Sequence, residues 1–129
     1  MVNSFQINNT EISLDTVAWR ALSNLTERFA FNETESLVLM GNMPRSTYYK
    51  GVKDQKVVLS RDQKERISYL LGIYKALRVL FVDSEQAMSW ITRNNSLAPF
   101  NGKTPKEHLL EGSLVRLSET RRFLDYWRG

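Results

Sequence analysis

The sequence contains no cysteine and only one histidine among its 129 residues. The absence of cysteine excludes disulfides, thiolate metal sites and covalent cysteine chemistry. A single histidine cannot supply a multi-histidine site, so we expect no metal and no other cofactor. No apolar run approaches the roughly 18 residues needed to cross a bilayer, and the first residues lack a basic segment followed by an apolar core. We therefore expect a cytoplasmic protein that does not enter the membrane.

Motifs that carry catalysis are also missing. The sequence shows no paired carboxylates in a recognisable arrangement, no nucleophile placed with a histidine and no glycine-rich phosphate loop. His108 lies beside Leu109 with no second ligand or nucleophile in view, so we interpret it as a surface or packing residue. We expect neither an enzyme nor a small-molecule substrate. A small helical enzyme stays open as an alternative, because the absence of a motif does not exclude catalysis.

The formal net charge of +4 is unevenly distributed. Residues 1–59 carry six Lys or Arg and six Asp or Glu, whereas residues 60–129 carry twelve and eight. The excess therefore lies in the second half, which weakens a DNA-binding argument based on total charge. The first half nevertheless contains a local basic cluster, which consists of Arg45, Lys50, Lys53 and Lys56 around a single acid, Asp54. Local charge of this kind is the more relevant signal for nucleic acid.

Apolar residues recur at three- and four-residue steps along most of the chain, which predicts an all-α protein. Residues 1–12 are polar and are predicted to form a mobile arm. Ser13 is placed to cap the first helix. A capping pair, Asn32 and Glu35, opens a short second helix that Gly41 can end in a left-handed conformation.

A tight turn then leads to a third helix, with Pro44 in its first turn and Gly51 at its end. Residues 33–52 have the spacing of a helix-turn-helix, whose second helix presents polar and basic side chains to the major groove. The expected DNA-contacting residues are Arg45, Ser46, Thr47, Tyr48, Tyr49, Lys50 and Lys53. Tyr48 or Tyr49 could pack on the DNA backbone or in the protein core. Spacing alone leaves open a second interpretation, in which two packed helices share a solvated face.

The longest predicted helix begins after Ser60, which forms a capping box with Gln63. Its apolar stripe consists of Ile67, Leu70, Leu71, Tyr74, Leu77, Leu80 and Phe81. Arg66, Lys75 and Arg78 are expected to lie off this stripe. We place a domain boundary between residues 58 and 59.

The second half is predicted to contain a loop and two further helices. Thr104 and Glu107 form a capping box for a short helix that Gly112 ends, and Ser113 is expected to cap the last helix. Leu97 and other apolar residues of this region are interpreted as core. The last helix is rich in arginine and aromatic residues, which are enriched at interface hot spots. It could dock on a partner or close the core, and the two roles are compatible.

Several segments of the second half together resemble the Xre/MbcA/ParS antitoxin family. They are Leu59-Ser-Arg-Asp-Gln63, Leu71-Gly-Ile-Tyr-Lys-Ala-Leu77, Trp90-Ile91, Pro99-Phe-Asn-Gly-Lys-Thr-Pro105 and Arg121-Arg-Phe-Leu-Asp125. The segment from Met40 to Tyr49 is similar to the family's N-terminal Xre-like helix-turn-helix. The resemblance implies an Xre-like DNA-binding domain over residues 1–58, followed by a small helical toxin-binding domain over residues 59–129.

The family resemblance also implies a function. Such proteins are antitoxins of type II toxin–antitoxin pairs, and they block the active site of a cognate RES-domain toxin that consumes NAD or transfers ADP-ribose. They also bind their operon promoter for autoregulation, commonly as homodimers. By position, the toxin-binding residues are Asn101, Lys103, Arg121, Arg122, Asp125, Tyr126, Trp127, Arg128 and Gly129. The alternative function is a stand-alone helix-turn-helix transcriptional regulator whose C-terminal domain only dimerises.

Overall fold

The computed structural model describes residues 12–129, so the arm predicted over residues 1–12 lies almost wholly outside the described residues. Within this part the chain is all-helical and contains no strand. The elements are α1 (Leu14–Arg28), α2 (Glu33–Leu39), α3 (Arg45–Asp54), α4 (Arg61–Leu80), α5 (Ser84–Ser89), the 3-10 helix η1 (Trp90–Thr92), α6 (Pro105–Leu109) and α7 (Leu114–Arg128). The predicted all-α class is confirmed.

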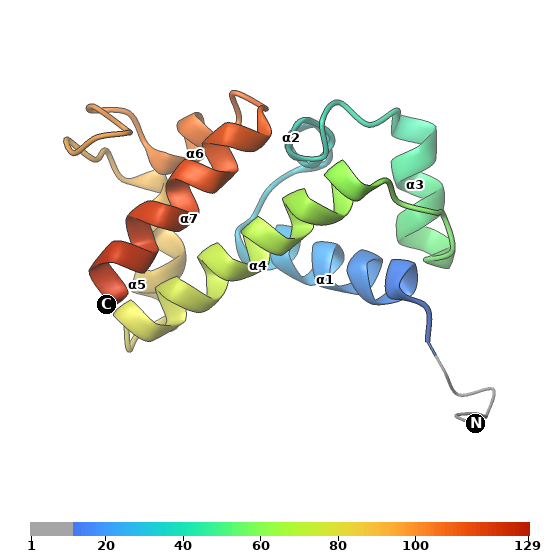
Figure 1. Cartoon of the computed structure of the whole chain (residues 1–129), viewed down its shortest axis with the longest axis horizontal. Helices are drawn as coiled ribbons and strands as arrows, with labels where there is room; N and C mark the ends of the chain where they lie inside the picture. The colour runs from blue at the N-terminus through green and yellow to red at the C-terminus, as the bar shows by residue number, and fades with distance from the viewer. Residues whose placement is uncertain (1–11) are drawn as a thin grey trace.

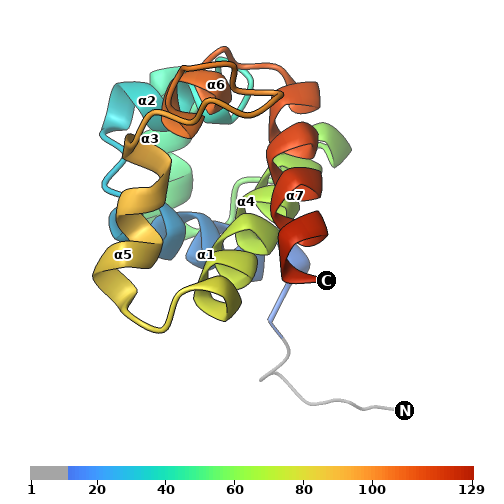
Figure 2. The ribbon, with the colours of Figure 1, turned by 90° about the vertical axis from the view of Figure 1, so that its left-hand side faces the viewer.

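The long helix α4 connects the two halves of the molecule. In Figure 1, α1, α2 and α3 gather around one end of α4, and α5, α6 and α7 gather around its other end. Figure 2, seen along a perpendicular direction, shows α7 lying beside α4, and these two helices pack against each other. Helix α4 packs against α1 as well. Its buried residues contribute to a core cluster that includes side chains from both halves.

Local capping signals place the helix starts correctly. Asn32 and Glu35 form the predicted capping box of α2, in which the Glu35 amide donates to Asn32 Oδ1 at 2.8 Å. The capping boxes of α4 and α6 are also present, and Ser13 caps α1. Each box satisfies backbone N–H groups that a helix start leaves without partners. These bonds join residues three apart, so their formation depends little on the rest of the fold.

Two predicted helix signals are wrong. Helix α3 does not end at Gly51 but continues to Asp54, and Gln55 ends it in a left-handed conformation with a φ of 61°. Gly51 is buried against α1, where an added Cβ would overlap the ring of Trp19. Ser113 stands at the N-cap position of α7, but its hydroxyl donates to Glu111 Oε1 at 2.9 Å and makes no cap bond.

Arg66 is buried rather than lying off the apolar stripe, with 7% of its surface exposed. Its Nη1 donates to two backbone carbonyls, Leu39 O at 3.0 Å and Gly112 O at 2.9 Å. Its Nε donates to Asp62 Oδ2 at 2.8 Å. The guanidinium thus joins the end of α2 to the turn that precedes α7. The expectation for Arg66 failed because these carbonyls come from segments distant in sequence.

The segment that follows α3 is attached to α1 by four hydrogen bonds, one of which Arg20 Nε donates to Gln55 Oε1 at 3.1 Å. Trp19 Nε1 donates to Val57 O at 2.8 Å, and Thr16 Oγ1 donates to Gln55 O at 2.8 Å. The Leu59 amide donates to Asp15 Oδ1 at 3.1 Å. These bonds fix α3 relative to α1 just before α4 begins.

No helix within residues 12–129 is both long enough and apolar enough to span a bilayer. The same residues contain no group of three or more histidine or carboxylate side chains placed to hold a metal ion.

Candidate functional site

Helix α3 presents one exposed face, and most of the residues predicted to contact DNA lie on it. Arg45, Ser46, Tyr49, Lys50 and Lys53 are exposed. These positions recur at three- and four-residue steps and therefore share a side of the helix.

Two residues of the predicted DNA-contacting set lie differently. Thr47 is half-buried, and Tyr48 is buried in the core. The Tyr48 ring meets Trp19 edge to face with 6.1 Å between ring centroids. Of the two tyrosines, Tyr48 is therefore the one that packs in the core, whereas Tyr49 stays on the exposed face.

The exposed face of α3 is basic, and its cations differ in their partners. Arg45 Nη1 donates to Glu33 Oε2 at 2.6 Å, so its charge is partly neutralised by the start of α2. Lys50 and Lys53 on this face, and Lys56 just after the helix, form no ion pair within residues 12–129. These three lysines are therefore free to neutralise phosphate groups, which dominate protein–DNA affinity.

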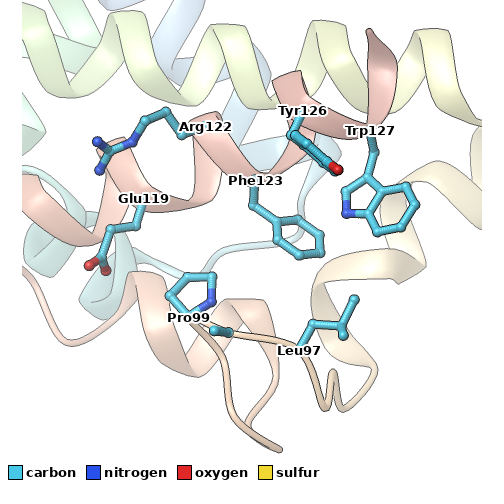
Figure 3. Close-up of a pocket in the computed structure, with 8 residues that line it drawn as sticks. Leu97, Pro99, Glu119, Arg122, Phe123, Tyr126 and Trp127 are labelled. Carbon is cyan, nitrogen blue, oxygen red and sulfur yellow. The ribbon is translucent and has the colours of Figure 1, made fainter.

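A second candidate surface lies between α7 and the loop over residues 93–104. An open apolar groove of about 510 Å³ runs between them. Its lining residues are Leu97, Ala98, Pro99, Glu119, Arg122, Phe123, Tyr126 and Trp127. Figure 3 shows Phe123, Tyr126 and Trp127 extending from α7 toward Leu97 and Pro99 on the loop. Tyr126 is 80% exposed and Trp127 is 56% exposed, which is unusual for such large aromatic side chains.

The structure divides the predicted toxin-binding residues into three groups. Arg122, Tyr126 and Trp127 line the apolar groove. Asn101 and Lys103 line a neighbouring polar hollow of about 390 Å³, which shares Pro99 and Glu119 with the groove. The others lie outside both hollows: Arg121, Asp125, Arg128 and Gly129.

Arg121 faces α4 rather than the groove. Its guanidinium lies where a Cβ on Gly72 would be, and its Nε donates to Asp125 Oδ2 at 3.1 Å. Arg128 is the second partner of Asp125, at 3.9 Å. Arg121 therefore helps to hold α7 against α4, and Asp125 balances the charges of Arg121 and Arg128.

The loop side of the groove is held by its own hydrogen bonds. The Gly102 amide donates to Asn95 O at 2.7 Å, and the Asn101 amide donates to Leu97 O at 3.0 Å. Asn101 and Gly102 both have a positive φ, which is typical of a tight Asn-Gly turn. Leu97, which was interpreted as core, is 49% exposed on this loop. The spacing of apolar residues could not show whether Leu97 is buried or exposed, because the loop has no helical repeat.

The polar hollow contains a hydrogen-bonded network that the sequence did not predict. His108 is buried, and its Nε2 lies 2.8 Å from Glu119 Oε1. Arg116 Nη1 donates to the same oxygen at 3.0 Å. The pKa of Glu119 is lowered, mainly by the hydrogen bond that its carboxylate accepts from Arg116 and further by the one that it accepts from His108. The network joins α6 to α7, and of the two roles predicted for His108, surface or packing, the structure places it in the buried one.

Comparison with known proteins agrees with the arrangement of α1 to α3. Residues 11–72 match the family described as the antitoxin Xre-like helix-turn-helix domain. A Sinorhizobium fredii protein named "Uncharacterized protein y4oB" is 35% identical over 109 residues, which cover 84% of this chain and 82% of the relative. Residues 11–72 of the chain therefore belong to the antitoxin Xre-like helix-turn-helix family.

The Xre-like match includes the start of α4 as well as α1, α2 and α3. This agrees with the packing of α4 against α1. The similarity to y4oB covers more residues than the Xre-like domain itself, so it continues into the second half of the chain. The chain is therefore similar to this relative in part of its second half as well as in the Xre-like domain.

Proposed function

We propose that this Xre-like protein is the antitoxin of a type II pair of the Xre/MbcA/ParS kind, which neutralises a RES-domain toxin that consumes NAD or transfers ADP-ribose. The observation that carries the proposal is the exposed aromatic and arginine surface of α7 in a chain with an antitoxin Xre-like domain. Exposed Tyr126 and Trp127 beside Arg122 have the composition of an interface hot spot. The similarity of residues 59–129 to the family's toxin-binding domain supports the same conclusion.

In the proposed mechanism the antitoxin acts by occupancy and performs no chemistry of its own. The last turns of α7, together with Asn101 and Lys103, cover the entrance of the toxin's NAD-binding cleft. The toxin then loses activity because its substrate cannot enter. Inhibition is expected to be stoichiometric, with activity falling linearly to the equivalence point when binding is tight.

The same proposal assigns promoter binding to the exposed face of α3. In helix-turn-helix dimers, paired recognition helices contact half-sites about 34 Å apart. We propose that this protein dimerises for the same purpose, with Lys50 and Lys53 placed at phosphate groups. Sedimentation equilibrium of the chain alone and with promoter DNA tests the dimer.

The test of toxin neutralisation is deletion of Tyr126–Gly129, followed by titration against the purified product of the adjacent gene with NAD consumption as the readout. Removing two exposed aromatic residues should weaken binding by at least about 2 kcal/mol, a factor of roughly 30. Circular dichroism of the variant must show no loss of helix beyond the deleted end of α7. Tyr49→Ala, which removes an exposed tyrosine from α3, is the matched control and should neutralise normally. Unchanged inhibition by the deletion variant would contradict the proposed mechanism.

A further inference from the structure

The groove beside α7 continues into a second apolar hollow. This hollow has a volume of about 300 Å³ and shares Leu97, Phe123 and Trp127 with the groove. It extends toward the end of α4, where Leu80 and Phe81 line it. The two hollows lie on either side of the shared residues, so together they can accept two apolar side chains from one extended or helical segment.

The floor of the groove is built from stacked aromatic rings. Phe123 stacks on Trp90 with 6.0 Å between ring centroids and meets Phe100 edge to face at 5.1 Å. Trp127 lies beside Phe123 at 6.3 Å, and Tyr126 is perpendicular to Trp127 at 5.6 Å. Because Phe100 is almost fully buried, this floor is fixed by the core. A preformed floor lowers the ordering cost that binding must overcome.

The charge at the rim of the groove indicates what the occupant must carry. Arg122 lines the groove and forms no ion pair within residues 12–129, whereas the three other arginines of α7 each face a carboxylate. Glu119, the acidic residue of the lining, is already engaged by Arg116 and His108. The groove therefore presents one uncommitted positive charge next to an apolar floor. An acidic group on the occupant would complement it.

We propose that the groove receives a segment of the toxin that inserts two apolar side chains, one on each side of Leu97, and places a carboxylate against Arg122. This inference rests on the proposed function, because it takes the toxin as the partner. It adds a reciprocal contact: while α7 covers the toxin's cleft, the toxin fills the groove of the antitoxin. Exposed Leu97, Tyr126 and Trp127 are all buried in such a complex.

The test measures the affinity of the purified adjacent-gene product for four single variants by isothermal titration calorimetry. Leu97→Ser removes the shared apolar residue that the loop contributes to both hollows, and Arg122→Glu reverses the rim charge. Both should weaken binding at least tenfold. The matched controls are Val17→Ser, whose side chain is 50% exposed on α1, and Lys75→Glu, which makes the same charge change on the exposed face of α4. Both controls should bind as the wild type does, and thermal unfolding should show that all four variants are folded.

A photo-crosslinking amino acid at position 97 identifies the occupant directly. Mass spectrometry should find a toxin peptide with apolar residues next to Asp or Glu, and the same label at position 17 should capture none. A crosslink from position 97 to a second copy of this chain, or wild-type affinity of Leu97→Ser, would overturn the inference. Wild-type affinity of Arg122→Glu alone would overturn the carboxylate contact.

These outcomes separate the inference from the proposed function. If deletion of Tyr126–Gly129 abolishes neutralisation while Leu97→Ser has no effect, the toxin is the partner and the groove is not its contact. If the wild-type chain binds no toxin at all, both fall together.

Discussion

Single polar residues connect parts of this protein that are distant in sequence. Only 7% of Arg66 is exposed, and its guanidinium donates to the carbonyl of Leu39, at the end of α2, and to the carbonyl of Gly112. Carbonyl groups near a helix C-terminus carry partial negative charge and favour a cation. A buried donor that serves two such groups is costly to remove, because both carbonyls then lose their partner.

We therefore expect Arg66→Ala to lower the free energy of unfolding by about 2–3 kcal/mol. Urea denaturation followed by circular dichroism measures this change. Lys75→Ala, an exposed position on the same helix, is the matched control and should change stability by less than about 0.5 kcal/mol. Equal effects of the two variants would show that the bonds of Arg66 contribute nothing net.

The carboxylate of Glu119 makes stability depend on pH. Its folded-state pKa lies below the ordinary value of 4.5, mainly because of the hydrogen bond from Arg116. A lowered pKa stabilises the fold above about pH 4.5, and this contribution is lost as the pH falls through the folded-state pKa. Glu119→Gln should therefore be less stable than the wild type near pH 7, and the difference should shrink below about pH 4. Melting temperatures across this range test the prediction, which a constant difference would contradict.

Among the elements, α3 makes an especially close contact with α1 at Gly51. Gly51 lies against the ring of Trp19, and the ring nitrogen of Trp19 bonds the segment that follows α3. The contacts on the buried side of α3 thus fix the position of its exposed basic face. Any change that moves Trp19 should also move the residues proposed to contact DNA.

Gly51→Ala should destabilise the protein although alanine is the better helix former. The overlap with Trp19 costs about 1–3 kcal/mol, against a gain of about 0.5–1 kcal/mol from helix propensity. The melting temperature should therefore fall by several degrees. Ser46→Ala, on the exposed side of the same helix, is the control and should leave it nearly unchanged. A stabilised Gly51→Ala variant would mean that α1 and α3 can separate at no cost.

The helices could be predicted from the sequence because their signals are local. Each capping box is formed by two residues that are three positions apart in the sequence, as in Asn32 with Glu35 and Ser60 with Gln63. Such a pair can be recognised from the sequence alone. Gly51 was misinterpreted as a helix end because its partner, Trp19, lies in another helix. The same reason hid the groove, since Leu97 and the aromatic residues of α7 meet only in the folded chain.

At the scale of the whole molecule, the two candidate surfaces lie at different ends. In Figure 1, α3 lies beyond one end of α4 and the last turns of α7 lie near the other. A substitution on one surface is therefore separated from the other by packed helices. The proposed activities should be separable by mutation even though both depend on one core.

Lys50→Ala and Lys53→Ala should each weaken binding to a promoter fragment and reduce the slope of log affinity against log salt by about 1. Toxin neutralisation by both variants should equal that of the wild type. Fluorescence anisotropy at several salt concentrations measures the slope. Lys75→Ala serves as the control, and an unchanged slope for all three variants would show that α3 is not the DNA-contacting helix.

The position of α4 between α1 and α7 has a consequence for the lifetime of both activities. A single proteolytic cut within α4 would remove the supporting surface from the half that carries α3 and from the half that carries the groove. Neither fragment would retain a complete interior. Under the proposed function, turnover of this chain would relieve promoter repression and release the toxin in one event, with no intermediate species that still performs one task.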